Sequence, residues 1–415
     1  MARAGQRKPS SDSRLTDHIS VGALTRVFPP ELVDGVVAQA GRTEQRSRLL
    51  PARVVVYYVL ALALFADSAY EEVMRQLVEG LAWQSGWQQR WELPSKVAIY
   101  KARVRLGAEP LELLFRAAGA PLAASGTRGA FYRGLRLVSI DGTCLDVADT
   151  PGNEEAFGRP GSFRRDGGGA FPQLRMVALA ESGTHAIFNA AFDSYKTAER
   201  TLAKRLYPSL EHGMLCLADR GFYGFQAFQD ASSAGAQLLW RVSSGVLLPR
   251  ERTLADGSYL TSIYAPGNRE ARRDGQAARV IEYRISDPAL SGEDQSYRLL
   301  TTILDPEPAP ARELAALYPQ RWELESALDE LKTHQRGPRV VLRSKLPDGV
   351  RQEVWGHLCT HYAIRRIMHD AAMGADLVPH RLSFTAGLRA ARRSARTQPG
   401  LSPPQNPDSA PADDR

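Results

Sequence analysis

The sequence predicts an α/β protein in which an all-helical N-terminal domain precedes a mixed-sheet domain with a β-rich insertion. Three observations lead to this prediction. Residues 15–126 carry apolar residues at helical spacing, and residues 132–242 hold short apolar or alternating runs between helical segments. Residues from about 245 to 300 are rich in turn residues and short alternating runs, which indicates the insertion.

Length, charge and cysteine content limit the classes of protein to which this sequence can belong. The 415 residues are enough for two or three domains, and a net charge of +7 weakly favours a polyanionic partner. The three cysteines are far apart and form no C-x-x-C pair, which excludes a zinc ribbon and fits a reducing cytosol. The basic N-terminus has no apolar core behind it, and the longest apolar run, 54–66, is too short for a bilayer. We therefore expect a cytoplasmic protein with no membrane partner.

The domain boundaries follow changes in composition. We expect a disordered tail at 1–15, a helical N-terminal domain at 16–126, and a mixed-sheet domain at 127–370 with its insertion at about 245–310. A basic segment and a second disordered tail fill 371–415, because residues from about 397 onward are rich in Ser, Pro, Asp and Arg without periodicity.

Three helices are predicted in the N-terminal domain. A Pro-Pro start and Gly41 bound a helix at 29–41, and the apolar run at 54–66 is expected to be a buried helix. Ser95 caps a helix at 95–106, on which Lys96, Tyr100 and Arg103 share one face. That basic face could enter a DNA groove, although a solvated surface helix explains it equally well. Trp83, Trp87 and Trp91 are interpreted as core packing.

The mixed-sheet domain is predicted element by element. Strands are expected at 135–141, 173–181, 185–193, 214–219 and 236–242, with helices at 198–210 and 225–234. A long helical segment is expected from 311 to about 368.

Two acids stand at the ends of predicted strands. Asp141 and Asp219 each follow a short apolar run and precede a glycine within two residues. Ligands bind beyond the carboxyl ends of strands in open α/β sheets, so these carboxylates meet if their strands are neighbours. Two close acids repel unless a divalent cation neutralises them, and Mg²⁺ prefers oxygen ligands. The alternative is that each aspartate caps a turn.

A third acid lies in the predicted helix that spans 318–332. Tyr318, Arg321, Glu325 and Lys332 are spaced so that they share one helix face. A phenol, two cations and an acid do not make a core stripe, and they can place a metal ligand beside phosphate-binding groups. A solvated helix face with an Arg321–Glu325 pair is the alternative.

These motifs resemble the DDE transposases of the insertion-element-4 type. The likeness rests on Asp-Gly-Thr at 141–143, Asp-Arg-Gly-Phe at 219–222 and the Y-R-E-K pattern with Arg-Trp-x-x-Glu at 321–325. Residues 41–65 and 93–107 also resemble the helical N-terminal domain of that family, so the likeness covers about 20–370.

The resemblance implies an RNase-H-like catalytic core with the insertion between its second and third acids. It implies that Asp141, Asp219 and Glu325 are catalytic and hold two Mg²⁺ ions, with Mn²⁺ as a substitute. Tyr318, Arg321 and Lys332 are then expected to contact DNA phosphates, and Arg241 suits the same role. The implied partners are double-stranded DNA, as terminal inverted repeats and target, and a second copy of the chain in a synaptic dimer.

One departure and two alternatives stay open. Better-studied relatives form a DNA hairpin and hold a flipped base on a tryptophan of the insertion, but residues 242–317 contain no Trp, only tyrosines such as Tyr259, Tyr264 and Tyr283. A tyrosine could stack a base, or the hairpin route could be absent. The alternatives to a transposase are a nuclease on the same fold that never joins DNA, and a catalytically idle DNA-binding protein derived from a transposase.

Overall fold

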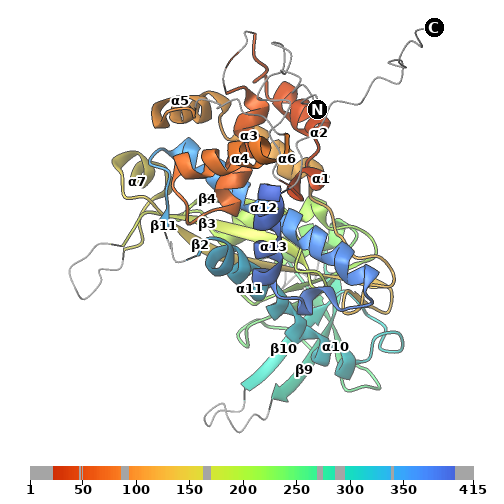
Figure 1. Cartoon of the computed structure of the whole chain (residues 1–415). Helices are drawn as coiled ribbons and strands as arrows, with labels where there is room; N and C mark the ends of the chain where they lie inside the picture. Colours follow the sequence, from red (N-terminus) through yellow and green to blue (C-terminus); the bar gives the residue numbers. More distant parts are fainter. Residues whose placement is uncertain are drawn as a thin grey trace, which may run out of the picture.

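The computed structural model places helices from both ends of the chain against one long mixed sheet (Figure 1). It describes residues 22–45, 48, 50–85, 93–161, 170–268, 274–285, 295–337 and 341–397. The tails expected at 1–15 and beyond 397 lie outside these residues, as do Trp87 and Trp91. Within the described residues, no helix is long and apolar enough to cross a membrane.

The N-terminal part is helical, as expected. Its helices are α1 (Leu24–Val27), α2 (Pro30–Gln39), α3 (Ala52–Leu64), α4 (Tyr70–Ser85), α5 (Lys96–Leu106) and α6 (Glu109–Ala118). The helices predicted at 29–41, 54–66 and 95–106 correspond to α2, α3 and α5. Every residue of α3 except Arg53 is buried, since a helix that is apolar on all sides has to be covered on all sides.

The C-terminal helices complete this helical layer. α12 (Pro347–Gly374) packs along α3 and α6, and α13 (Phe384–Thr397) packs against α4 and α12. Figure 1 shows the orange N-terminal helices and the blue C-terminal helices side by side on the same side of the sheet. A boundary at residue 126 therefore does not separate two bodies in space, because α12 supplies one wall around α3.

The sheet begins with five strands in the expected order. They are β2 (Leu135–Val147), β3 (Gln173–Glu181), β4 (Ile187–Ser194), β5 (Met214–Ala218) and β6 (Gln237–Arg241), and the short β1 (Phe131–Tyr132) pairs with β2. In the sheet they lie in the order β4-β3-β2-β5-β6, with β2, β3 and β4 antiparallel and β2, β5 and β6 parallel. This is the RNase-H-like arrangement, so the predicted fold class is confirmed.

Helices connect these strands. α7 (Pro151–Phe157) follows β2 and was not predicted, while α9 (Phe225–Ser233) matches the helix expected at 225–234. The helix expected at 198–210 is divided into α8 (Glu199–Lys204) and the 3-10 turn η2 (Tyr207–Ser209). Pro208 lies in that turn, and proline has no N–H with which to continue an α-helix.

The insertion extends the sheet. Its strands are β7 (Arg252–Thr253), β8 (Tyr259–Ile263), β9 (Gln276–Ile285) and β10 (Gln295–Thr301). β10 pairs with β6, so the order continues β6-β10-β9-β8-β7. Residues 269–273 of this insertion lie outside the described part.

The helical segment expected at 311–368 is not continuous. It consists of α10 (Ala311–Leu317), the 3-10 turn η3 (Tyr318–Arg321), α11 (Trp322–Asp329) and the π-helical turn η4 (Glu330–Gln335). Gly337 then adopts φ +67°, and β11 (Val341–Leu342) pairs with β2 before α12 begins. The prediction of one helix was wrong because periodicity does not register a left-handed glycine or a tertiary strand pairing.

Candidate active site

Two strands pair with the same edge of strand β2. β5 pairs with β2 from Arg136 to Ile140, and β11 pairs with it at Asp146 and Val147. The other edge of β2 is occupied by β3 from Val138 to Asp146. Among the residues that the structure describes, no strand pairs with the first edge between β5 and β11, and Asp141 is the first residue of this interval.

Asp141 does not end its strand, contrary to the prediction. β3 carries the pairing of β2 past Asp141, and the strand that ends at this level is β5, at Ala218. Gly142 follows Asp141, and a Cβ there would lie 2.8 Å from Oε1 of Glu199, whose side chain would have to move aside. Its backbone N–H donates to Oδ1 of Asp141 at 2.8 Å, which orients the carboxylate.

The first two acids lie next to one another on one face of the sheet. Ile140 and Ala218 are paired on parallel strands, so Asp141 and Asp219 follow at equivalent positions. Along β5, Leu215 and Leu217 belong to the smaller hydrophobic core under α10, and Asp219 continues that alternation. The sheet register thus brings the first two predicted site residues together.

Arg241 joins them from the next strand. It ends β6, and its Nη1 lies 3.9 Å from Oδ1 of Asp219. Its guanidinium also lies over the ring of Tyr297, 4.3 Å from the centroid, and Tyr297 stacks on Tyr283 across β9 and β10 at 5.3 Å. Tyr283 was one of the tyrosines singled out in the sequence, whereas Tyr297 was not; pairing of the runs 276–285 and 295–301 as neighbouring strands could have indicated it. By contrast, Tyr259 is buried and donates to Glu282.

The third acid reaches the site through an arginine. Nη1 of Arg321 donates to Oδ2 of Asp141 at 2.8 Å, and its Nη2 donates to Oε1 of Glu325 at 2.8 Å. Arg321 is 7% exposed, whereas the Glu325 side chain is 55% exposed. Arg321 therefore lies between two of the three acids, in a bridge that spacing on one helix could not reveal.

This bridge changes what was expected of the acids. Among the described residues, no three His, Cys, Asp or Glu side chains form a ready-made metal-ligand set. Asp141, Asp219 and Glu325 are close enough to influence one another electrostatically, but the guanidinium separates Asp141 from Glu325. The expected convergence of all three carboxylates on one point is thus incomplete in this structure.

The electrostatics of the site follow from burial. Burial raises the pKa of Asp141, and the Gly142 N–H and Arg321 only partly oppose that rise. Burial lowers the pKa of Arg321, but its bond to Glu325 and the neighbouring acids outweigh this effect, so the net pKa is raised. The site is therefore a partly buried place where negative charge is unfavourable without a cation.

The other two members of the Y-R-E-K pattern lie apart from the bridge. Tyr318 is buried in the smaller core, and its hydroxyl donates to the carbonyl of Ala218 at 3.4 Å. Lys332 is exposed on the π-helical turn. The prediction that all four side chains share one regular helix face was wrong, because 3-10, α and π turns succeed one another between 318 and 335.

The predicted face of α5 is split. Tyr100 is exposed, and Lys96 is exposed beside Glu71 at 3.3 Å. Arg103 points inward instead, where its Nε donates to Gln352 at 2.7 Å and its guanidinium lies over Tyr70. Its placement on an open DNA-facing surface was wrong, since α12 and Tyr70 occupy that side of the helix.

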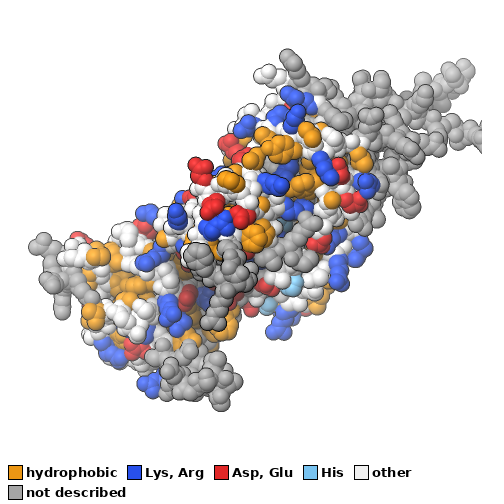
Figure 2. All heavy atoms as spheres, turned by 90° about the vertical axis from the view of Figure 1, so that its left-hand side faces the viewer, with side chains coloured by type: hydrophobic (Ala, Val, Ile, Leu, Met, Phe, Trp, Pro, Cys, Tyr) orange, Lys and Arg blue, Asp and Glu red, His pale blue; other side chains and the backbone are white. Residues whose placement is uncertain are grey.

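An apolar stripe accompanies the basic residues on the outer side of α5. Val97, Tyr100 and Val104 are each more than half exposed, and Lys101 lies among them. Figure 2, which looks onto the side of the molecule that carries α5, shows hydrophobic and basic side chains intermingled in its upper part. Tyr100 and Val104, together with Lys345 and Leu346, line a pocket of about 250 Å³.

Comparisons with known proteins agree with this geometry. A model for the "Transposase DDE domain" matches residues 132–362, and one for the "Insertion element 4 transposase N-terminal" matches residues 18–116. The chain is 29% identical over 389 residues to the transposase InsG of insertion sequence element IS4 from Escherichia coli (strain K12), covering 93% of this chain and 85% of that protein. It is 26% identical over 246 residues to the putative transposase InsZ of the same strain, covering 59% and 77%. Among solved structures, a piggyBac transposase synaptic complex with hairpin DNA overlays with a TM-score of 0.47 at 10% identity, covering 90% of this chain and 79% of that chain.

Proposed function

Because the chain belongs to the family of DDE transposases of the insertion-element-4 type, we propose that it cuts DNA at its element's ends and transfers the freed 3′-OH to target DNA. The observation that carries the proposal is the adjacency of Asp141 and Asp219 on parallel strands, with Glu325 linked to Asp141 through Arg321. Such an acidic site at the end of β5 suits phosphoryl transfer, which depends on charge neutralisation and alignment.

The three acids are proposed to hold divalent cations, two Mg²⁺ ions with Mn²⁺ as a substitute. The residues fit this role, since Asp141 is oriented by Gly142, Asp219 is its neighbour, and the exposed Glu325 side chain has room to reorient. That Arg321 is held by two of the acids supports their capacity to share a cation. When bound, the ions activate the attacking oxygen and stabilise the leaving one.

The basic side chains around the acids are proposed to hold the DNA backbone. Arg241 and Arg321 border the acids, and Lys332 is exposed two turns beyond Glu325. Arginine donates bidentately to phosphate, so Arg321 can exchange a carboxylate for a phosphate oxygen without losing its ionic partner. Tyr318, which was expected to contact the backbone as well, is buried and donates to the carbonyl of Ala218, so we assign it to the support of the strand end that carries Asp219.

The N-terminal part is proposed to recognise the terminal inverted repeats. The outer side of α5 offers Lys96 and Lys101 for phosphates and Tyr100 with two valines for base edges in a groove. Arg103 supports this surface indirectly, by fixing α5 to α12. Two copies of the chain are proposed to pair the two ends in a synaptic dimer, so that each catalytic site cuts one end.

Glu325→Gln tests the proposal directly. The variant should lose cleavage of an end-containing duplex and joining of pre-cut ends in Mg²⁺, while its DNA affinity stays within about twofold of wild type. Asp329→Asn is the matched control, because it removes one exposed carboxylate from the same helix. Wild-type cleavage by Glu325→Gln would contradict the assignment.

The same assay separates the alternatives. A nuclease without joining activity would cut the end duplex but leave pre-cut ends unjoined, and an idle DNA-binding protein would do neither.

A further inference from the structure

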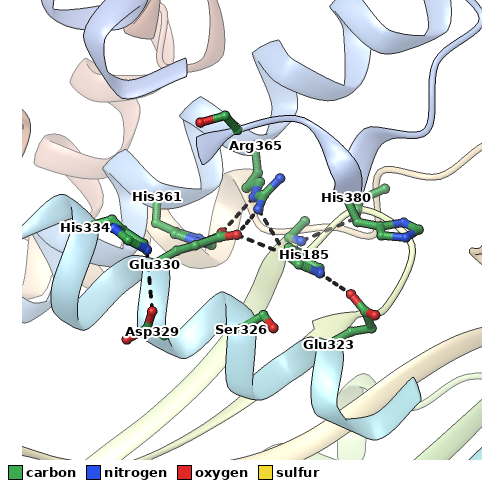
Figure 3. Close-up of polar contacts among 12 residues, drawn as sticks. His185, Glu323, Ser326, Asp329, Glu330, His334, His361, Arg365 and His380 are labelled. Atoms are coloured by element: carbon green, nitrogen blue, oxygen red, sulfur yellow. Dashed lines mark hydrogen bonds and ion pairs between the residues drawn. The ribbon is translucent and has the colours of Figure 1, made fainter. Parts of the chain in front are cut away.

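A buried cluster of charged and imidazole side chains lies behind the helix that carries Glu325 (Figure 3). Glu330, on the π-helical turn, accepts from Nε of Arg365 at 2.8 Å and from Nε2 of His361 at 3.2 Å, both on α12. His185, in the turn between β3 and β4, completes the cluster. Three parts of the fold that are distant in sequence are thereby joined at one carboxylate.

His185 bridges two positions that flank Glu325. Its Nε2 lies 2.5 Å from Oε2 of Glu323, and its Nδ1 lies 3.0 Å from Oε1 of Glu330. Glu323 precedes Glu325 by two residues, and Glu330 follows it by five. Because one rigid ring bonds both ends of this stretch, it restrains the position and rotation of α11 where Glu325 projects.

The charges of the neighbouring side chains stabilise the contacts that His185 makes with Glu323 and Glu330. Burial lowers the pKa of His185, but its bonds to Glu323 and Glu330 outweigh that effect, so the net pKa is raised. Nη2 of Arg365 also lies 2.9 Å from Nδ1 of His185, so this nitrogen contacts both a guanidinium and a carboxylate. Burial also lowers the pKa of His361, whose Nε2 lies 3.2 Å from Oε2 of Glu330. Arg365 and His185 thus face the carboxylates of Glu330 and Glu323, and removing one member of such an ionic set leaves an uncompensated charge.

The backbone is strained where the bridge begins. His185 adopts φ +59°, a left-handed conformation that non-glycine residues enter only at an energetic cost. The turn that contains His185 is held by a backbone hydrogen bond, in which the N–H of His185 donates to the carbonyl of Glu181 at 2.9 Å. At the other end, Glu330 opens a π-helical turn, a geometry frequent at functional sites.

From these contacts we infer that His185 is a positioning residue for Glu325, acting through Glu323 and Glu330 to hold α11 at the register that the acidic site needs. The inference rests on the proposed function and names the device that keeps the third acid in place. Supporting groups around a site commonly change metal affinity or rate by about 10–100-fold, because small misplacements of a ligand are costly.

The test uses His185→Asn in the full chain. Asparagine tolerates the left-handed backbone but cannot bond Glu323 and Glu330 together. We expect half-saturating Mg²⁺ to rise and the maximal cleavage rate to fall, each by about 10-fold or more, while affinity for end DNA stays within about twofold. Mn²⁺ binding without DNA, measured by electron paramagnetic resonance, should weaken in parallel.

His369→Asn is the matched control. It makes the same substitution at a buried histidine of α12 that bonds Thr127. With both variants assayed equally far below their melting temperatures, a His185→Asn protein that loses no more rate or metal affinity than the control overturns the inference. If His185→Asn does not fold, Glu323→Ala removes only the outer bond and should shift Mg²⁺ dependence in the same direction, and no shift would again overturn the inference. Cleavage that survives Glu325→Gln refutes the proposed function instead, so the two failures are distinguishable.

Discussion

Replacing Arg321 by methionine should destabilise the folded protein, and replacing Asp141 by asparagine as well should recover part of the loss. Arg321 is nearly buried and donates to Asp141 and to Glu325, each at 2.8 Å. Methionine fills much of the same volume but cannot compensate the carboxylate of Asp141, which remains partly buried.

The magnitude follows from the exposure of the two partners. The Asp141 side chain is 20% exposed, and a hydrogen bond to such a charged group contributes about 1.5–3 kcal/mol. The Glu325 side chain is 55% exposed, so solvent screening reduces its pair to roughly 0.5 kcal/mol. Arg321→Met should therefore cost about 2–3 kcal/mol of unfolding free energy.

The pH dependence of folding stability that Asp141 contributes has the opposite sign to that of a carboxylate in a stabilising salt bridge. Its folded pKa is raised above the ordinary 3.8, so protonation favours the folded state and stability falls as pH rises through the range above 3.8. At pH 7 its charge opposes folding, and Asp141→Asn alone should be neutral or stabilising. The coupling energy between the two substitutions should then be at least about 1 kcal/mol.

Urea unfolding at pH 7 of the wild type, the two single variants and the double variant measures the coupling energy between Arg321→Met and Asp141→Asn. Arg128→Met is the control, because the Arg128–Asp376 pair is exposed on both sides and should change stability little. If the changes in unfolding free energy caused by Arg321→Met and Asp141→Asn add within about 0.5 kcal/mol, the guanidinium does not hold Asp141 in solution and the reasoning fails.

Two further predictions concern acid stability and DNA binding. The bonds of Glu330 to His185, His361 and Arg365 outweigh its burial and depress its pKa below 4.5, so the stability that Glu330 contributes is present above pH 4.5 and is lost below it. Glu330→Gln should therefore flatten the fall in melting temperature between pH 5 and 3. An unchanged fall in melting temperature over this range would count against the cluster. Lys96→Ala should weaken binding of the end sequence and lower the salt slope of its gel-shift affinity by about 1, whereas an unaltered slope would remove Lys96 from the DNA interface.

Local patterns in the sequence determined the elements and the candidate acids. Alternation and apolar runs located strands such as 173–181, and Pro, Ser and Gly signals located α2 and α5, because these features act within a few residues. The acids and the Y-R-E-K spacing identified the family by resemblance, and the matches to family models agree.

The tertiary structure decided which of those residues meet, and how. Parallel pairing of β2 with β5 brought Asp141 beside Asp219, which directly follows the last residue of β5. Arg103 points toward α12, and Arg321 lies between two acids and not on a solvated face.

The His185 cluster shows the physical reason for this division. Its members come from the β3–β4 turn, α11, the π-helical turn and α12, and none of them has a neighbour in sequence that signals the contact. Periodicity records only which side of an element is apolar, whereas a buried charge requires a partner that the packing of distant elements must supply. The sequence by itself therefore determined the elements and the acids, and only the folded chain decided the ionic contacts that position them.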